Sequence, residues 1–301
     1  MDRFESMSVL VAAVEAGSLS AASRRLGMPL ATLSRKVSVL EAHLKTQLLN
    51  RSSRRLTLTD AGRSYVEASK RILEEIGEAE RAASGEYTAP RGELIVTAPI
   101  VFGRLHVLPV VTEFLKAYQD IGIRLVLADR MVNLLEDHVD VAVRIGELPD
   151  SSLVATRIGS IGRVVCGSLA YFSERGVPRT PSDLSKYDCV TFEGLMSPNT
   201  WIFGTGKSAV SIRIRSRLVV NTAEAAIDAA IAGVGITRVL SYQAANAIRA
   251  GTLALALREF EPTPLPVNLV FAGQGLLPLK LRAFLDFAAP RLKARLSRTL
   301  T

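Results

Sequence analysis

The 301-residue sequence is poor in the residues that mark disulfide-rich, metal-binding or membrane-spanning proteins. It has only two cysteines, Cys166 and Cys189, with no Cys-x-x-Cys or Cys/His spacing. We interpret them as buried free thiols, with a disulfide or redox switch as the alternative. No stretch approaches the roughly 18 apolar residues of a membrane helix, and the first residues lack a charged-then-apolar export signal. We therefore expect a cytoplasmic protein with no membrane partner.

The motifs of common catalytic sites are also missing. The three histidines, His43, His106 and His138, lie far apart and lack the spacing of metalloprotease ligands. There is no P-loop, no Gly-x-Ser-x-Gly elbow and no Gly-x-Gly-x-x-Gly fingerprint. We therefore predict no enzyme activity, no cofactor and no metal site.

Positive charge is in excess, and most of it lies in one stretch. The whole chain has a formal net charge of +8. Between Arg24 and Arg55 there are eight basic residues and one acidic residue, Glu41, which leaves +7 in this stretch alone. Localised positive charge of this kind neutralises DNA phosphates. The distribution favours a nucleic-acid partner over an anionic membrane surface.

Two helix patterns lie inside this basic stretch, on either side of a break at Gly27-Met28-Pro29. The first spans Leu19 to Leu26, and the second has an apolar stripe at the helical period: Leu33, Val37, Leu40 and Leu44. One buried stripe with a small polar and basic face outward suits a helix that enters a DNA major groove. The residues assigned to DNA on this helix are Leu30, Ala31, Thr32, Ser34, Arg35 and Lys36. Ser34 and Arg35 are the predicted base readers, and Lys36 is assigned to phosphate.

A helix from about Arg3 to Ala16 precedes this pair, and a hairpin pattern follows it. Gln47 to Arg51 and Arg54 to Leu58 are short extended runs on either side of a small polar turn, typical of a wing. We assign Arg51, Arg54 and Arg55 of this wing to phosphates or the minor groove. An ordinary solvated loop is the alternative.

One long helix is predicted from Asp60 to about Ser84. Its apolar positions alternate in steps of three and four: Ala61, Tyr65, Ala68, Ile72, Ile76, Ala79 and Ala83. Such a heptad-like seam suggests pairing with a second copy of the chain. Tyr65, Ala68, Ile72, Ile76 and Ala79 are the predicted dimerisation residues. Packing against its own domain is the alternative.

Residues 17–62, which include the basic stretch, resemble the winged helix-turn-helix of LysR-type transcriptional regulators. The matching residues are Gly17-Ser18, Ala21-Ala22, Leu26, Ser34-Arg35, Leu40-Glu41, Leu44, Leu48, Arg51, Arg55, Leu58-Thr59 and Ala61-Gly62. Leu49 stands where the family usually has Phe, and Pro29-Leu30-Ala31 replaces a common Ser-Gln-Pro. Leu30 can offer DNA only an apolar contact, for instance to a thymine methyl.

The resemblance covers essentially the whole chain and implies its organisation. The fold would be an N-terminal all-α winged helix-turn-helix with a long linker helix, followed by an α/β effector domain of two lobes like a periplasmic binding protein. The expected boundaries are 1–59 for DNA binding, 60–91 for the linker helix and hinge, and 92–301 for the effector domain. Lobe 1 would take about 92–161 and 268–301, and lobe 2 about 162–267. The expected partners are an imperfect DNA palindrome, a small anionic or aromatic metabolite and further copies in a homodimer or homotetramer, with RNA polymerase as another candidate.

Beyond residue 92, strand and helix patterns alternate, which favours an α/β domain with a mainly parallel sheet. Phe102 to Ala117 is predicted to be helical with a break or kink at Pro109, and Met131 to Asp137 to be a short helix. The crossings between lobes are placed near Gly162 to Gly167 and Val267 to Ala272.

The effector site is predicted at the strand ends and helix N-termini that face the family's cleft. The residues assigned to it are Thr97, Ala98, Pro99, Ile100, Phe102, Ala128, Asp129, Arg144, Ile145, Gly146, Trp201, Thr222 and Gly235. Alternatives remain for several of them. Thr97 and Thr222 can be simple helix caps, Trp201 a core residue, and Gly235 part of a tight turn. Arg144 can pair with a nearby acid.

Three other protein classes compete with a regulator. A solute-binding transport protein would share the C-terminal fold but would need an export signal and would lack the first 60 residues. An enzyme with a DNA-binding appendage would need a catalytic constellation that the sequence does not show. A constitutive architectural DNA binder would bind without a ligand and without sequence preference.

Overall fold

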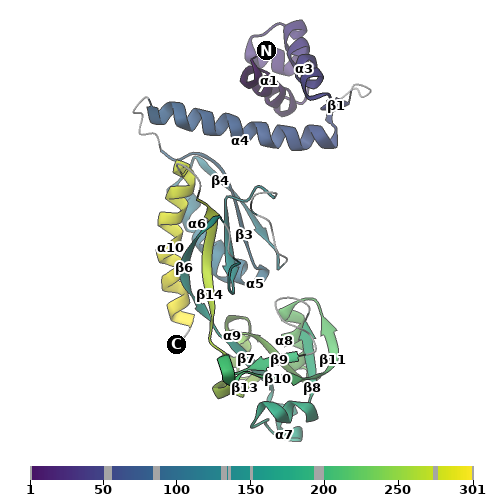
Figure 1. The fold of residues 1–301 in the computed structure, drawn as a ribbon, viewed down its shortest axis with the longest axis vertical. Helices are drawn as coiled ribbons and strands as arrows, with labels where there is room; N and C mark the ends of the chain where they lie inside the picture. Colours follow the sequence, from purple (N-terminus) through teal and green to yellow (C-terminus); the bar gives the residue numbers. More distant parts are fainter. Residues whose placement is uncertain are drawn as a thin grey trace. The chain divides into compact units, whose positions relative to one another are not determined.

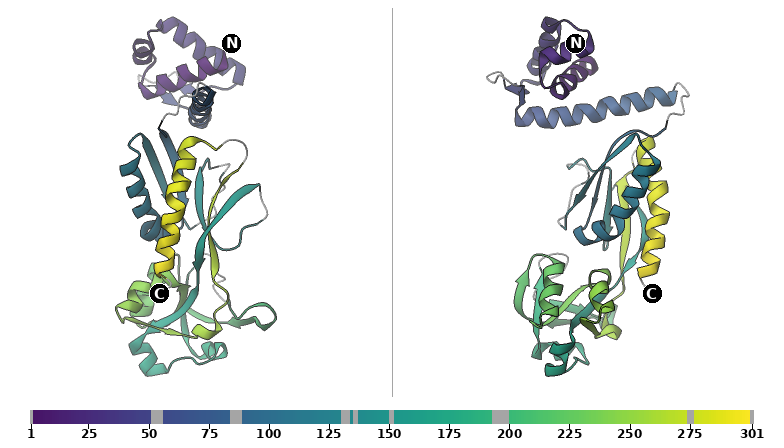
Figure 2. Two further views of the ribbon diagram at one scale, coloured as in Figure 1. Left: turned by 90° about the vertical axis from the view of Figure 1, so that its left-hand side faces the viewer. Right: turned by 180° about the vertical axis from the view of Figure 1, so that it is seen from behind.

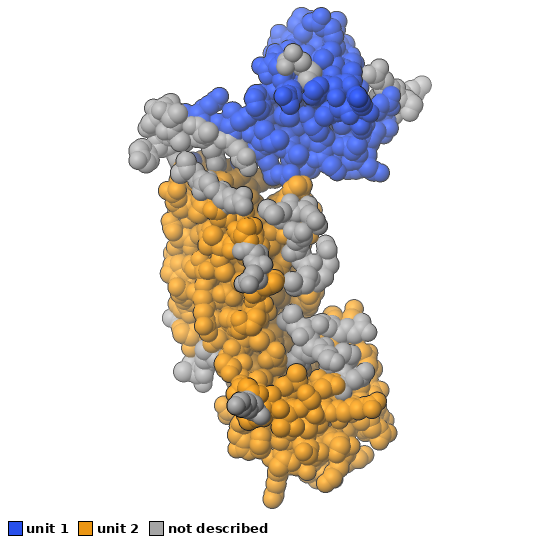
Figure 3. All heavy atoms as spheres, viewed as in Figure 1, with its two compact units in different colours: residues 1–89 blue, residues 90–301 orange. Residues whose placement is uncertain are grey.

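The computed structural model describes residues 2–50, 56–83, 89–129, 134, 137–149, 152–192, 200–273 and 277–299. The chain divides into two compact units, residues 1–89 and 90–301 (Figure 3). The predicted wing arginines Arg51, Arg54 and Arg55 lie outside the described residues, as does most of the helix predicted from Met131 to Asp137.

The described residues of unit 1 form four helices and a small hairpin (Figure 1). Its elements are α1 (Arg3–Glu15), α2 (Leu19–Leu26), α3 (Leu30–Leu44), β1 (Leu49–Asn50), β2 (Thr57–Leu58) and α4 (Asp60–Ala83). Local chemistry sets the helix ends. The Asp2 carboxylate caps α1 by accepting from the Glu5 N–H, and the Ser18 hydroxyl caps α2. Gly27 ends α2 in a left-handed conformation, with φ of 61°.

The core of unit 1 lies between α1 and the helix-turn-helix. Leu10 of α1 and Leu33 and Leu40 of α3 are fully buried there. The Glu41 carboxylate is also buried and accepts hydrogen bonds from the N–H groups of Leu48 and Leu49, at 2.8 and 3.1 Å. Because these N–H groups begin the wing, a buried charge with two donors fixes the wing to the end of α3.

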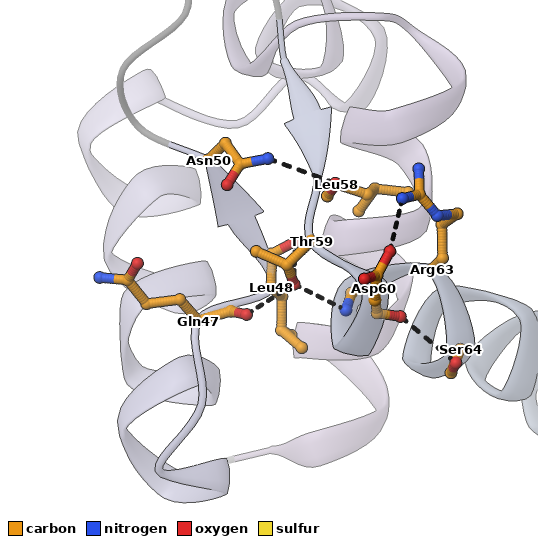
Figure 4. Close-up of polar contacts among 9 residues, drawn as sticks. Gln47, Leu48, Asn50, Leu58, Thr59, Asp60, Arg63 and Ser64 are labelled. Atoms are coloured by element: carbon orange, nitrogen blue, oxygen red, sulfur yellow. Dashed lines mark hydrogen bonds and ion pairs between the residues drawn. The ribbon is translucent and has the colours of Figure 1, made fainter.

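A second joint connects the wing to α4 (Figure 4). The Thr59 hydroxyl donates to the Gln47 carbonyl at 2.7 Å and accepts from the Gly62 N–H at 2.9 Å. A Cβ at Gly62 would lie 2.0 Å from the carbonyl oxygen of Leu48. Only glycine therefore allows α4 to approach the wing this closely.

Unit 2 has two lobes, each built on a five-stranded sheet. Lobe 1 contains β3 (Gly92–Ala98), α5 (Ile100–Phe102), a π-helical turn (Gly103–Val107), α6 (Leu108–Ala117), β4 (Ile121–Leu127), β5 (Val141–Ile145), β6 (Leu153–Ile161), β14 (Leu265–Ala272) and α10 (Leu279–Thr299). Lobe 2 contains β7 (Arg163–Ser168), α7 (Leu169–Arg175), β8 (Asp188–Phe192), β9 (Thr200–Phe203), β10 (Val210–Arg213), β11 (Arg215–Val220), α8 (Ala223–Ile231), β12 (Ile236–Leu240), α9 (Ser241–Arg249) and β13 (Leu253–Ala256). Short 3-10 helices lie at Pro181–Lys186, Gly206–Ser208 and Arg258–Phe260.

Both five-stranded sheets are mixed, so the prediction of a mainly parallel sheet was wrong. In lobe 1 the order is β4-β3-β5-β14-β6, with the β4-β3-β5 pairs parallel and the β5-β14-β6 pairs antiparallel. In lobe 2 the order is β11-β8-β12-β7-β13, with the same division. The antiparallel pairs arise where the chain passes between the lobes. Figure 2 shows α6 and α10 on the same face of the lobe 1 sheet.

The first crossing lies at the start of its predicted segment, and the second lies just before its own. The chain leaves lobe 1 at Gly162, between β6 and β7, and returns between β13 and β14 through a segment that contains Pro262 and Pro264. The predicted segments, Gly162 to Gly167 and Val267 to Ala272, fall largely within strands β7 and β14. A β-rich pattern does not separate a crossing strand from a sheet strand, and the prolines were the better signal.

The predicted helix from Phe102 to Ala117 does break, but the irregularity precedes Pro109. The π-helical turn spans Gly103–Val107, and Pro109 lies in the first turn of α6. Pro109 has no N–H, so the Leu105 carbonyl one turn earlier loses its helical partner. Arg295 of α10 donates to this carbonyl at 3.1 Å. The break is therefore joined to the C-terminal helix.

Candidate nucleic-acid interface and effector site

Helix α3 presents one exposed row of residues. Ala31, Arg35 and Val39, spaced four apart, are exposed along it. Ser34 and Thr32 are half-buried on its flanks. Val39 is 43% exposed and was not assigned to DNA from the sequence. Its spacing from Arg35 at the helical period was the signal that could have found it.

Lys36 has a different environment from the one predicted. Its ammonium forms an ion pair with the Glu5 carboxylate of α1. Lys36 is half-buried on the side of α3 that faces α1, whereas Arg35 is exposed. The predicted contact of Lys36 with phosphate would therefore compete with an ion pair inside the protein.

The hairpin that carries the predicted wing is present. Strands β1 and β2 pair antiparallel, and the Asn50 amide donates to the Leu58 carbonyl at 3.3 Å (Figure 4). The three predicted wing arginines lie between these strands in the sequence, outside the described residues.

Helix α4 has two distinct faces. Gly62, Val66 and Ser69 are buried, and α4 packs against α1. Part of α4 is therefore covered within its own unit, as the alternative interpretation held. The predicted seam lies on a neighbouring face: Tyr65, Ala68 and Ile76 are half-buried, and Ile72 is 38% exposed. The side chain of Ala79 is outside the described residues.

In lobe 1, an aspartate already occupies the helix N-terminus that was assigned to the effector site. Asp129 accepts a hydrogen bond from the Ile100 N–H at 3.0 Å, so two predicted site residues do meet. The Thr97 hydroxyl instead donates to the Val126 carbonyl of β4 at 2.9 Å, and Thr97 is fully buried. Thr97 is therefore neither a helix cap nor an open ligand contact. Pro99 and Ala128 beside it are half-buried.

Three rings meet where lobe 1 and lobe 2 contact each other. Phe102 lies 4.8 Å from the ring of His106 and 5.5 Å from that of Tyr242, which belongs to α9 of lobe 2. His106 and Tyr242 lie 5.7 Å apart. Of these three residues, only Phe102 was assigned to the effector site from the sequence, because nothing in the sequence spacing connects it with Tyr242.

Burial controls the ionisation of this cluster. His106 is 7% exposed, and neither ring nitrogen has a hydrogen-bond partner among the described residues. Burial, and then the positive charge of Arg295, lower the pKa of His106 to about 4. Burial raises the pKa of Tyr242, and the carboxylates of Asp129 and Glu224 raise it further. The imidazole is therefore neutral near neutral pH.

The other predicted site residues are divided between the lobes. Arg144 is half-buried on β5, and burial lowers the pKa of its guanidinium. Ile145 belongs to the lobe 1 core, as do Ala98 and Phe102. The Gly146 N–H donates to the Pro266 carbonyl at 2.9 Å. In lobe 2, the Thr222 hydroxyl caps α8 by accepting from the Ala225 N–H at 3.2 Å, as the alternative interpretation held.

Two predicted effector residues of lobe 2 lie elsewhere. Trp201 is 2% exposed and belongs to the lobe 2 core with Phe203 and Tyr171. Gly235 precedes β12, at the N-terminal end of its parallel strands, whereas ligands bind at the opposite end. A Cβ at Gly235 would lie 2.3 Å from the Asp188 carbonyl oxygen. The glycine serves strand packing.

A buried ion pair fixes the returning crossing to lobe 2. The Arg238 Nε of β12 donates to Glu261 at 3.2 Å, and the guanidinium lies 4.5 Å from the ring centre of Phe203. The side chains of Arg238 and Glu261 are only 2% and 9% exposed. Burial raises the pKa of Glu261, while Arg238 opposes that shift. This pair is a structural contact of the crossing.

The cysteines behave as buried thiols. Cys166 and Cys189 are fully buried and free, on strands β7 and β8 that β12 separates. Burial raises the pKa of each thiol to about 12, so neither forms the reactive thiolate.

The described residues contain neither a metal-binding cluster nor a single membrane-spanning helix. No group of three or more His, Cys, Asp or Glu side chains in the described part of the chain could hold a metal ion. No single described helix is long and apolar enough to cross a membrane, and only the bent pair α1 and α2 meets that test jointly.

Comparison with known proteins decides the family. Residues 4–63 match the bacterial regulatory helix-turn-helix protein family lysR, and residues 88–293 match the LysR substrate binding domain. The chain is a LysR-type transcriptional regulator. Members of this family bind DNA to regulate transcription and are not enzymes, as the sequence predicted.

Relatives of this LysR-type regulator match it over nearly their whole length. A transcriptional repressor of Pseudomonas aeruginosa is 32% identical, over 95% of this chain and 91% of its own. The transcriptional activator AaeR of Escherichia coli is 31% identical, over 95% and 93%. The structure of CrgA, a LysR-type regulator of Neisseria meningitidis, is 31% identical with a TM-score of 0.60, and the match covers 96% of this chain and 98% of that one. The N-terminal helix-turn-helix and the two-lobe C-terminal domain are thus confirmed.

Proposed function

We propose that this regulator is a cytoplasmic homo-oligomer that reads an imperfect DNA palindrome and responds to a small aromatic or anionic metabolite. The observation that carries the DNA part is the exposed row on α3, where Arg35 lies between two small or apolar neighbours, Ala31 and Val39. Arg35 reads a base edge, with Ser34 and Thr32 at its flanks and Leu30, 45% exposed, offering an apolar contact. Arg51, Arg54 and Arg55 contact phosphates. RNA polymerase remains a candidate partner of the bound oligomer.

The seam on α4 supports the oligomer. Tyr65, Ala68, Ile72 and Ile76 follow the helical period on a face next to the one that packs on α1. Pairing of this seam with a second copy buries it and gives the two-fold protein that a palindrome requires.

The effector enters between the lobes, near Asp129, Ile100 and the ring of Tyr242. The three rings at this junction favour an aromatic ligand. An anionic ligand cannot use the N–H of Ile100 as a hydrogen-bond donor, because this N–H already donates to Asp129. Half-buried Arg144 is then the candidate partner for a carboxylate. A ligand can change the DNA complex only to the extent that it binds one arrangement of the lobes more tightly than another.

The decisive experiment is fluorescence anisotropy with the DNA just upstream of the protein's own coding region, compared with random DNA of equal length. Both are titrated at two salt concentrations. A preference for the upstream DNA that survives higher salt is expected for a specific regulator. Equal binding that collapses with salt would instead support the architectural binder.

The effector class has a separate test. Thermal shifts of the full-length protein are compared for a panel of aromatic carboxylates and their neutral amides. An aromatic effector gives matched shifts for acid and amide, whereas an anionic effector favours the acid. Asp129→Asn should then strengthen acid binding, because it removes a negative charge from the site.

A further inference from the structure

Helix α1 has an acidic residue near each end, and each of them pairs with a basic residue of the helix-turn-helix. Glu5 pairs with Lys36 of α3, and Glu15 pairs with Arg25 of α2 at 3.2 Å. Since α1 also packs against α4, it connects both helices of the helix-turn-helix to α4. Two of the basic residues counted in the +7 stretch are therefore neutralised within the protein.

The two pairs differ in their exposure. The side chains of Lys36 and Glu5 are 25% and 45% exposed, whereas those of Arg25 and Glu15 are 60% and 40% exposed. The Lys36 ammonium thus lies closer to the packed surface between α1 and α3. The Arg25 pair is the more open one and serves as a matched control.

The position of Lys36 on α3 gives its pair a geometric consequence. Consecutive residues of a helix point about 100° apart, so Lys36 faces α1 while Arg35 faces outward. A rotation of α3 by about 10° would move a side chain at a radius of about 5–6 Å by roughly 1 Å. Such a displacement matters for the bidentate contact of an arginine with a base edge.

We propose that Lys36 is a positioning residue. On DNA it stays paired with Glu5, fixes the rotation of α3 and so aims Arg35 at its base, and it does not contact phosphate. This inference rests on the proposed sequence-specific DNA binding. Because half-exposed ion pairs add little to folding stability, the effect of the pair falls on specificity and not on the melting temperature.

The test uses full-length variants and the operator selected in the anisotropy experiment. Glu5→Gln and Lys36→Gln should each lower the ratio of operator to random-DNA affinity about 3- to 10-fold, as misaiming of one base contact would. The slope of log affinity against log salt should not change. The double variant should lose no more than either single one, and Lys36→Arg and the swap Glu5→Lys with Lys36→Glu should restore the ratio. Glu15→Gln and Arg25→Gln should leave the ratio unchanged.

The competing assignment predicts the opposite signs. If Lys36 contacts phosphate, Lys36→Gln weakens operator and random DNA alike and lowers the salt slope by about 0.9. Glu5→Gln then tightens binding to both DNAs, because it releases Lys36. Any of three results would overturn the proposal: this phosphate-contact pattern, an unchanged affinity ratio in every variant, or an equal drop of the ratio in the control pair. If the wild type itself shows no operator preference, the proposed function fails before this comparison begins.

Discussion

Arg35 stands at the centre of the DNA-reading surface, since it is the charged residue in the exposed row of α3. Arg35→Ala should cost about 1–3 kcal/mol of operator binding and relax specificity at one position. Anisotropy on operator and random DNA measures both effects. Equal losses on the two DNAs would contradict base reading. Arg54→Ala is the comparison variant, and it should weaken all sequences alike and lower the salt slope.

His106 makes the stability of unit 2 dependent on pH. Its folded pKa is about 4, below the ordinary value of 6.5, so between these values the unfolded chain binds a proton that the folded chain does not. The contribution of neutral His106 to the free energy of unfolding is therefore fully present above pH 6.5. It is lost as the pH falls toward 4, by about 3 kcal/mol in all. His106→Leu removes the titrating group.

Urea unfolding of unit 2 at pH 7 and pH 4.5 measures this contribution. The wild type should lose more stability between the two values than His106→Leu does. His138→Asn replaces an exposed histidine whose φ of 54° asparagine tolerates, and it should keep the wild-type dependence. Equal pH dependence in all three proteins would show that His106 does not control it.

At the residue scale, periodicity predicted which side of α3 is exposed but not which charge is already paired. Glu5 and Lys36 are far apart in sequence, and only the packing of α1 on α3 brings them together. The same holds for Asp129 at the N-terminus of α5. Trp201 could be assigned to core or ligand wall from composition alone, and tertiary packing decided for the core.

The elements of unit 1 were predictable because local signals agree with one another. The caps at Asp2 and Ser18 and the left-handed Gly27 mark helix ends in the sequence itself. In unit 2, alternating strands and helices gave the class of fold but not the direction of each strand. Strand direction depends on where the chain changes lobes, and the β-rich pattern does not encode that change; Pro262 and Pro264 before β14 are its local sign.

The seam on α4 provides a prediction at the scale of an element. Ile72→Glu places a charge in the proposed helix pair, and the variant should dissociate into monomers at micromolar concentration, since an unpaired buried charge is costly. Sedimentation of the free protein measures the change. Ser64→Glu, on an exposed position of the same helix, should leave the assembly intact. An unchanged dissociation constant for Ile72→Glu would exclude this face from the interface.

At the scale of the whole molecule, the chain has two compact units, and each has its own core. We expect two calorimetric transitions. Leu40→Ala in unit 1 and Phe114→Ala in unit 2 each remove a fully buried side chain at a cost of about 2–5 kcal/mol, so each should lower only its own transition, by roughly 10 °C or more. Operator DNA should raise only the transition that Leu40→Ala lowers, and an effector only the one that Phe114→Ala lowers. If both variants instead shift one common transition, the two units unfold together.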